Sequence, residues 1–367
     1  MAAGEALDPG LHSVMHGASK DQSDSTLSIT LGQTLGAGTS GTVYDVLHGP
    51  SAASSSGPVR TLEISIRSEG AEGTRRHAAE ALAEACSSGG RCVAKEVLLN
   101  DASDDEMARI TKEVDLHRLV SRGCSDIVKY IFSGFAADSG SRQFIVVMEA
   151  CQSDLWTVLT APMDRASSTA FDRAPSNNSI GSSRNAKPGL QRSPSASHAL
   201  TSHTVGRSKQ PTVEERALWT QSLCTALHHC HRCGVLHRDL NPWNVLVAAR
   251  ADGERGRCAR LADFGLAVEL QPEAQLQGIE ADGAQPLDES ALDSLYSAPE
   301  LGKCYGYAAD VFSLGMTLMA LWATADIGRG AAARSSDDLV THVEAAKEGA
   351  SRGEEAAASL VSHLQQA

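Results

Sequence analysis

The chain has 367 residues, of which 42% are apolar and 21% are charged, proportions that are ordinary for a globular protein large enough for two cores. Its formal net charge of −13 argues against non-specific binding of nucleic acid or of an anionic membrane, because both need a basic surface. Nine cysteines without a framework spacing predict free thiols in a reducing compartment, and no apolar run reaches the roughly 20 residues of a membrane span.

These features predict a cytoplasmic protein, with a nuclear location left open. The chain begins Met1-Ala2-Ala3-Gly4-Glu5, which lacks the charged and then apolar pattern of a signal peptide. Residues 1–27 are polar and have no apolar period, so we expect a disordered tail.

A glycine-rich run follows the first predicted strand, Leu27–Leu31. It spans Leu35–Tyr44 and has the spacing GxGxxG followed by valine. Strand-forming residues come next, over 42–47, where a dinucleotide-binding fold would place a helix. This context favours a strand–turn–strand flap whose backbone amides lie over phosphates. An isolated match of this kind is a plain glycine-rich hairpin in roughly one case in two.

A lysine and a glutamate at a matched spacing come next. Residues 48–91 are rich in Ser, Ala and Gly and predict a surface insertion with one extra strand at 62–66. Residues 92–99 then predict a strand that carries Lys95, and 104–120 an amphipathic helix. Glu113 lies at the edge of the apolar stripe of this helix, so it can face Lys95; the alternative is a solvated glutamate.

The middle of the chain contains two strands and a long polar segment. The strands are predicted at 127–135 and 144–148, and a short helix at 155–159. Residues 161–210 lack periodicity and are rich in serine, which predicts disorder. This second insertion is either a segment controlled by phosphorylation or a spacer, and the spacer is the simpler interpretation.

The helix predicted at 212–233 begins with a capping box, Thr212 with Glu215 three residues later. Its C-terminal end holds several histidines and cysteines between positions 228 and 233. A zinc site there is disfavoured, because the candidate ligands crowd one helix end and no second CxxC follows. Histidines favoured by the helix dipole account for the cluster better.

The most informative stretch is the loop His237-Arg238-Asp239-Leu240-Asn241-Pro242-Trp243-Asn244. Pro242 prevents a helix there, so a carboxylate, an amide and a cation lie together on one short loop. Nineteen residues after Asn244 comes Asp263-Phe264-Gly265, which adds a second carboxylate. Ala298-Pro299-Glu300 follows, and then an apolar helix is predicted at 310–322, with Asp310 at its start.

These motifs, in this order, resemble the protein kinase domain: GxGxxGxV, a strand lysine, a helix glutamate, HRD with Asn five residues on, DFG and APE. The resemblance implies an α+β, two-lobed fold, with an antiparallel sheet and one helix in the N-lobe and a mainly helical C-lobe. It divides the chain into an N-lobe at 28–149, with its insertion at about 48–91, and a C-lobe at 150–367, with its insertion at about 161–210. The C-terminal end is expected to be truncated, since a late arginine that would pair with Glu300 is not evident.

The resemblance also implies the cofactors ATP and Mg²⁺ and a role for each matching residue. Asp239 would orient the attacking hydroxyl and accept its proton, with Lys95, Glu113 and Arg238 as the other catalytic residues. Asn244 and Asp263 would hold Mg²⁺. The residues expected to contact the nucleotide are Leu35, Gly36, Ala37, Gly38, Thr39, Ser40, Gly41, Val43, Lys95, Glu149, Cys151 and Asp154. Met148 would lie at the back of that pocket, and Tyr130, His117, Phe264 and His237 would stack between the lobes.

The chain departs from the family pattern in the loop and in the segment after it. Many serine/threonine kinases have lysine where this chain has Asn241, and the position three before Tyr296 is Asp293 rather than threonine. Arg238 suggests control by a phosphate on the activation segment, with Ser290 and Ser294 as candidate acceptors for an upstream kinase. Acidic residues nearby, such as Asp293, are expected to supply part of that negative charge.

The sequence therefore predicts an ATP-dependent protein kinase that acts on Ser or Thr hydroxyls of a protein substrate and binds neither nucleic acid nor membrane. Two alternatives remain open. One is a weakly active or inactive pseudokinase that binds nucleotide as a scaffold. The other is a small-molecule kinase on a related fold, which the APE segment argues against, because that segment shapes a peptide platform.

Overall fold

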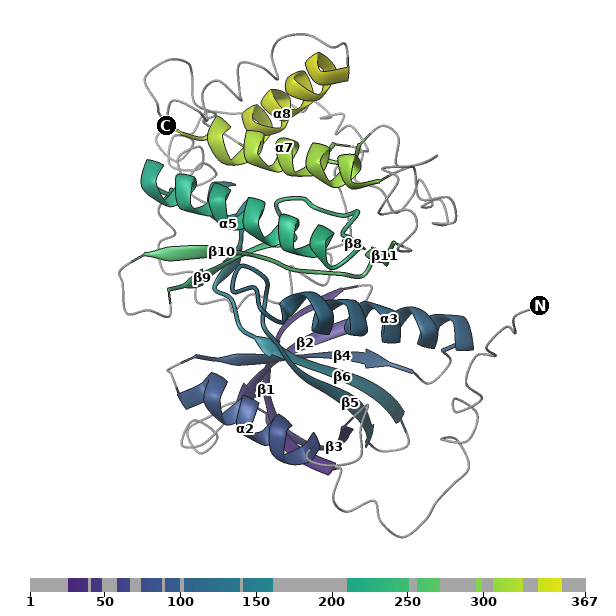
Figure 1. Ribbon diagram of the computed structural model, residues 1–367. Helices are drawn as coiled ribbons and strands as arrows, with labels where there is room; N and C mark the ends of the chain where they lie inside the picture. The colour runs from purple at the N-terminus through teal and green to yellow at the C-terminus, as the bar shows by residue number, and fades with distance from the viewer. Residues whose placement is uncertain are drawn as a thin grey trace, which may run out of the picture.

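The computed structural model shows two lobes, with α3 and the strands β1–β6 in one and α5, α7 and α8 in the other (Figure 1). The two-lobed arrangement predicted from the sequence is therefore confirmed. The structure describes residues 26–38, 41–47, 58–66, 74–87, 90–99, 102–138, 141–160, 210–250, 256–270, 295–298, 306–325 and 336–351. The predicted disordered tail before residue 26, the second insertion at 161–209 and the candidate phosphate acceptors Ser290 and Ser294 lie outside these ranges.

Six antiparallel strands of the N-lobe close into a barrel with the order β1-β2-β4-β6-β5-β3. Their bounds are Thr26–Gly38, Gly41–Leu47, Arg60–Ile66, Cys92–Leu98, Tyr130–Asp138 and Ser141–Glu149 for β1 to β6. The predicted antiparallel pairing is present, but the strands close into a barrel, and a second helix lies beside the one predicted. The closure depends on β3, which pairs with β1 through Leu62 and Ile29 and with β5 through Ile64 and Ala136.

Alternating side chains of the barrel strands supply two separate cores. In β6, Ile145 and Val147 belong to one buried cluster, whereas Val146 and Met148 belong to another. The second cluster includes Val114 of α3, Asp104–Ser121. Because successive residues of a strand point to opposite faces, one set of side chains fills the barrel and the other packs toward α3.

The segment predicted to be a surface insertion is in fact partly built into the N-lobe. It supplies β3 and the helix α2, Thr74–Ser87, whose Ala78 and Leu82 are buried in the same cluster as Ile29 and Ile145. The side chain of Arg60 on β3 also forms an ion pair with Glu96 of β4, the neighbour of Lys95. Described parts of the insertion are thus structural, although the rest of it lies outside the described ranges.

Within the described residues, the C-lobe contains three longer helices and short strands. The helices are α5, Val213–Arg232, α7, Tyr307–Ala323, and α8, Ser336–Ser351, and residues 155–160 are also helical. The strands form two small sheets, β10-β9-β7 and β11-β8. Their bounds are Ser153–Asp154, Val235–Leu236, Val245–Ala249, Arg257–Leu261 and Val268–Glu269 for β7 to β11.

The capping box predicted at the start of α5 is present, with Thr212 and Glu215 bonding each other's backbone. The predicted buried stripe is confirmed as well, from Trp219 and Leu223 to Cys230. Cys230 therefore packs in the core, and no group of three or more His, Cys, Asp or Glu within the described residues is placed to hold a metal ion. The same residues contain no helix that is long and apolar enough to cross a membrane.

A buried arginine joins the start of α5 to the end of α7. Arg216 of α5 donates to the carbonyl oxygen of Leu321 and to Thr324 Oγ1, at 2.7 Å, at the end of α7. Its other nitrogens donate to Gln210 Oε1 at 2.9 Å and to the carbonyl of Pro211 at 3.1 Å. Because every one of these partners is uncharged, the guanidinium acts as a multiple hydrogen-bond donor rather than as half of a salt bridge.

We expect Leu82→Ala in α2 to destabilise the protein by about 2–5 kcal/mol, because it leaves a cavity between the helix and the barrel. Urea denaturation would measure the loss. His77→Ala, at an exposed position of the same helix, serves as the control and should leave the midpoint unchanged. An unchanged midpoint for Leu82→Ala would show that α2 is a detachable surface element.

Candidate active site

The described residues of the glycine-rich run end β1 and begin β2, and these two strands pair antiparallel, as predicted. Gly36 pairs with Val43, and Gly38 with Gly41, while Thr39 and Ser40 lie outside the described residues. Gly41 has a φ of +133°, and a Cβ at this position would lie 2.3 Å from the carbonyl oxygen of Glu96. Only glycine fits there, because β2 passes close to the backbone of β4. Leu35 and Val43 are buried beneath the turn, and Ala37 is exposed at its tip.

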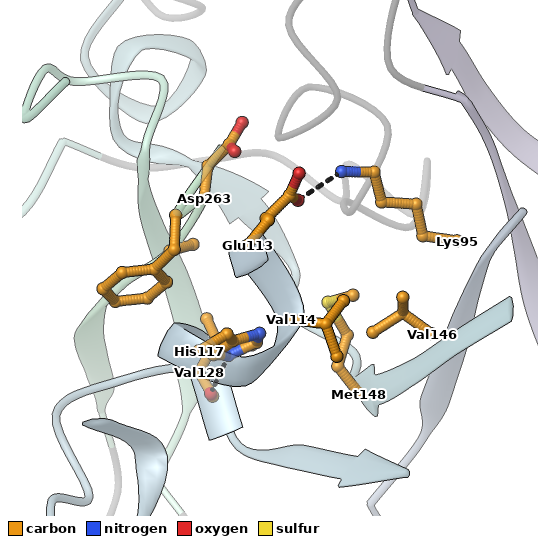
Figure 2. A pocket seen from close by; sticks show the side chains of 10 residues that line it. Lys95, Glu113, Val114, His117, Val128, Val146, Met148 and Asp263 are labelled. Carbon is orange, nitrogen blue, oxygen red and sulfur yellow. Dashed lines mark hydrogen bonds and ion pairs between the residues drawn. The ribbon is translucent and has the colours of Figure 1, made fainter. Parts of the chain in front are cut away.

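Lys95 and Glu113 form the predicted pair between strand and helix. Lys95 Nζ lies 2.7 Å from Glu113 Oε1, and only 6% of the lysine is exposed. Burial opposes the charge of the ammonium group, but the carboxylates of Glu113 and Asp263 outweigh it and raise the pKa of Lys95. Lys95 is therefore held as a cation inside the pocket that Figure 2 shows.

Asp263 reaches the same pocket from the C-lobe. Lys95, Glu113 and Asp263 all line it, together with Met148 at its apolar side (Figure 2). Asp263 has a φ of 64°, and its Oδ1 accepts a hydrogen bond from Gly265 N at 3.2 Å. A Cβ on Gly265 would come within 3.5 Å of Glu113 Oε2, so α3 and the turn after Asp263 are in close contact. The two lobes thus meet at these three charged side chains.

The loop that carries Asp239 is fixed by hydrogen bonds to the Asp239 carboxylate. Asn244 Nδ2 donates to Asp239 Oδ2 at 2.8 Å, and Asn241 Nδ2 donates to Asp239 Oδ1 at 2.8 Å. Asn244 also accepts from Ala262 N through its carbonyl oxygen, at 2.9 Å. This contact places the loop beside the residue that precedes Asp263.

Asp310 holds the other end of the same loop. Its carboxylate accepts from His237 N at 2.9 Å and from Arg238 N at 2.8 Å. Arg238 has a φ of 65°, and its Nε donates to the carbonyl oxygen of Leu266 at 2.6 Å. The arginine therefore links the loop to the segment that follows Asp263.

Four rings form the predicted stack between the lobes. Tyr130 meets His117 edge-on with ring centroids 5.9 Å apart, and His117 stacks on Phe264 at 5.3 Å. Phe264 in turn meets His237 at 5.0 Å. His117 Nε2 donates to the carbonyl oxygen of Val128 at 2.7 Å. Burial lowers the pKa of His117 to about 4, against the opposing effect of that hydrogen bond, so the ring is neutral.

In the segment between the lobes, the side chains of Glu149 and Asp154 form hydrogen bonds with nearby residues. Glu149 Oε1 accepts from Lys129 N at 2.7 Å and lies 3.3 Å from Arg260 Nη1. Asp154 caps the following helical turn, accepting from Thr157 N at 2.7 Å and from Thr157 Oγ1 at 2.8 Å. Cys151 is buried. The predicted contacts of Glu149, Cys151 and Asp154 with a nucleotide stay predictions.

The predicted metal ligands, Asn244 and Asp263, have the chemistry that Mg²⁺ requires. Amide and carboxylate oxygens are its usual protein ligands, and it usually takes only one or two such groups plus phosphates and water. Asn244 turns its Nδ2 toward Asp239, which directs its Oδ1 to the opposite side of the amide group. The two residues therefore fit a magnesium ion, although their binding of one stays a prediction.

Asn241 is the residue of the site whose role sequence reasoning missed. The family pattern indicates only that a lysine is missing at this position, yet the Asn241 amide donates to Asp239 and accepts from Trp243 N at 3.0 Å and from Asn244 N at 3.2 Å. A local signal existed, because asparagine before proline often bonds the backbone two or three residues on. The pairing of Arg60 with Glu96 had no such signal, because 36 residues separate the two.

Comparisons with known proteins agree with the motifs. A family model described as the protein kinase domain matches residues 195–362, a range that contains α5, the Asp239 loop, Asp263 and α7. The calcium/calmodulin-dependent protein kinase type II alpha chain of Drosophila melanogaster is 36% identical over 104 residues. That match covers 28% of this chain and 17% of the fly protein, so it spans under a fifth of the relative's length. The resemblance to protein kinases is thereby confirmed.

We expect Glu113→Gln to make Lys95 more reactive toward an amine-acylating reagent at pH 8–9. The substitution removes the anionic partner without changing the size of the side chain, so the pKa of Lys95 falls and its neutral fraction rises. Mass spectrometry of peptides would measure the labelling, with exposed Lys129 as the internal reference. Equal labelling of Lys95 in both proteins would contradict the electrostatic role of Glu113.

We expect His117→Leu to reduce the loss of stability on acidification. The folded protein binds a proton on His117 only near pH 4, whereas an unfolded chain binds it below about pH 6.5. Stability is therefore lost as the pH falls through this window, by about 2 kcal/mol between pH 7 and pH 5. Urea midpoints at these two pH values would test this.

The pKa of buried His237 is lowered in the same direction, so the pH dependence should shrink in His117→Leu rather than vanish. His77→Leu, at an exposed position, should change nothing. A pH dependence identical in all three proteins would count against a neutral, buried His117.

Proposed function

We propose that this chain, which matches the protein kinase domain over residues 195–362, transfers the γ-phosphate of ATP to Ser or Thr hydroxyls of protein substrates. The observation that carries the proposal is the assembled site. Lys95, Glu113 and Asp263 line one pocket, and the Asp239 loop is bonded to the strand that leads into Asp263. The family match covers the C-lobe only, so the position of Lys95 and Glu113 is independent support.

Asp239 would orient the substrate hydroxyl and accept its proton during transfer. Its carboxylate is partly exposed, and the two amide groups that hold it fix its direction. A general base contributes typically 10²- to 10⁴-fold to a reaction rate when it is correctly placed. Phosphoryl transfer depends mainly on positioning and charge, so a rigid Asp239 loop suits the reaction.

Lys95 would bind the α- and β-phosphates, and the glycine-rich turn would cover them with backbone amides. The contact of Glu113 with Lys95 keeps the ammonium group pointed into the pocket. Asn244 and Asp263 would hold Mg²⁺, which, when bound, neutralises negative charge on the phosphates. The Lys95–Glu113 pair is closed in this structure, as the reaction requires.

Arg238 is proposed to connect the site to its regulation. Its guanidinium group already contacts the segment after Asp263 through the Leu266 carbonyl. A phosphate placed on that segment by an upstream kinase would find a cation at this position. The net charge of −13 supports a protein partner and disfavours a nucleic acid.

We expect Asp239→Asn to lower the rate of phosphate transfer to a generic protein substrate by about 10²- to 10⁴-fold, because the amide cannot accept the proton. Transfer of labelled phosphate from MgATP would be measured with the purified chain. Binding of MgATP, followed by calorimetry, should remain within a few-fold of the original chain. Asp105→Asn, at an exposed position in α3, is the matched control and should stay active.

Two outcomes would contradict the proposal. Undiminished transfer by Asp239→Asn would remove Asp239 from the mechanism. Binding of MgATP without any transfer by the original chain would instead identify a nucleotide-binding scaffold, the alternative that the sequence left open. Transfer to a small molecule but to no protein would identify a small-molecule kinase.

A further inference from the structure

Asn241 is a buried polar side chain whose amide group has several partners. Only 1% of the residue is exposed. Its Nδ2 donates to Asp239 Oδ1 at 2.8 Å and to the Asp239 carbonyl oxygen at 3.2 Å. Its Oδ1 accepts from the backbone N–H groups of Trp243 and Asn244. Both ends of the amide group are therefore engaged, one with the carboxylate and the other with the loop backbone.

Asn241 and Asn244 hold the Asp239 carboxylate from two sides. Asn241 donates to Oδ1 and Asn244 to Oδ2, each at 2.8 Å, and both also donate to the Asp239 carbonyl oxygen. A carboxylate that accepts one N–H on each oxygen is restricted in its rotation about both side-chain torsions. These two contacts come from neutral groups, so they orient Asp239 without neutralising its charge.

Arg238, the cation next to Asp239 in the sequence, directs its Nε toward the segment after Asp263. Its Nε donates to the Leu266 carbonyl, and its backbone N–H is held by Asp310. The amide of Asn241 thus supplies a contact that is independent of the arginine beside Asp239. Because a misplacement of about 1 Å can reduce a rate by about 10²-fold, the group that fixes a catalytic carboxylate has kinetic importance.

We propose that Asn241 is a positioning residue that fixes the reactive direction of the Asp239 carboxylate through its Nδ2 and shapes the loop through its Oδ1. This inference rests on the proposed function, since it concerns the group that accepts the proton of the substrate hydroxyl. It assigns Asn241 an effect on the chemical step and not on the binding of nucleotide. Loss of an asparagine with a structural role alone would lower stability or weaken nucleotide binding without lowering kcat.

The first experiment compares steady-state kinetics of Asn241→Ala with those of the original chain. The kcat for phosphate transfer should fall about 10- to 100-fold, and the KM for ATP should stay within about twofold. Gln221→Ala, which removes an exposed amide from α5, is the matched control and should change neither constant. An unchanged kcat for Asn241→Ala, or a rise in KM with kcat retained, would overturn the proposal.

A second variant separates the two ends of the amide group. Asn241→Lys restores a donor that can reach Asp239 but removes the acceptor for the backbone of Trp243 and Asn244. Its kcat should exceed that of Asn241→Ala at least about fivefold. Its melting temperature should be as low as that of Asn241→Ala, because both variants lack the acceptor. A kcat no higher than that of Asn241→Ala would show that the donor to Asp239 has no role in the rate.

A measurement without turnover keeps this inference separate from the proposed function. In NMR spectra of the original chain, the two Nδ2 protons of Asn241 should exchange slowly with water, because both are bonded to Asp239. In Asp239→Ala, one of them should lose its protection while the fold is retained. Fast exchange of both protons in the original chain would overturn the inference. If they are protected but no phosphate is transferred, the proposed function fails and the positioning contact stands.

Discussion

The geometry of the site depends on one buried carboxylate. Asp310, 1% exposed at the start of α7, accepts the backbone N–H groups of His237 and Arg238 and also lies 2.9 Å from His231 Nε2. Arg238 has the left-handed backbone conformation, which costs a residue with a Cβ roughly 1–2 kcal/mol. Two charge-assisted hydrogen bonds of about 1.5–3 kcal/mol each exceed that cost. The carboxylate that α7 presents therefore stabilises the left-handed backbone conformation of Arg238, the residue before Asp239.

The N-lobe holds a buried lysine, Lys95, in a fixed position. Lys95 lies on β4, which pairs with β2 and β6 in the barrel, and Gly41 lets β2 pass within van der Waals range of β4. The added strand β3 removes the open edge that β1 and β5 would otherwise share, and its Arg60 pairs with Glu96 next to Lys95. Closure of the barrel restricts the movement of β4. This restriction helps to keep Lys95 within 2.7 Å of Glu113.

The sequence was sufficient for most features whose signal was local. The glycine turn, the capping box of α5, the stripe that buries Trp219 and the order of the charged motifs could all be predicted, because each depends on residues a few positions apart. The barrel could not be predicted, because β3 gains its partners from strands about 35 and 70 residues away and its own pattern fits an exposed strand equally well. Arg216 was missed for the same reason, since its partners at the end of α7 are 105 and 108 residues distant. The role of Asn241 has a local signal, since its partners lie within three residues, but a comparison with the family's lysine concerns charge and not these hydrogen bonds.

The charges of the described pocket bear on how a nucleotide would enter it under the proposed function. Lys95 is neutralised by Glu113, and Asp263 and Asp239 add two further negative charges close by. A bare triphosphate would meet more negative than positive charge there, and at an effective dielectric of about 20 each unit pair at 4 Å amounts to about 4 kcal/mol. A triphosphate that carries a divalent cation would meet the predicted ligands for that cation, Asp263 and Asn244. The neutral contacts of Asn241 leave this balance unchanged, whereas a lysine in its place would add a positive charge beside Asp239. The loop therefore relies on hydrogen-bond geometry to direct Asp239, and on Lys95 and the metal to offset the charge of the phosphates.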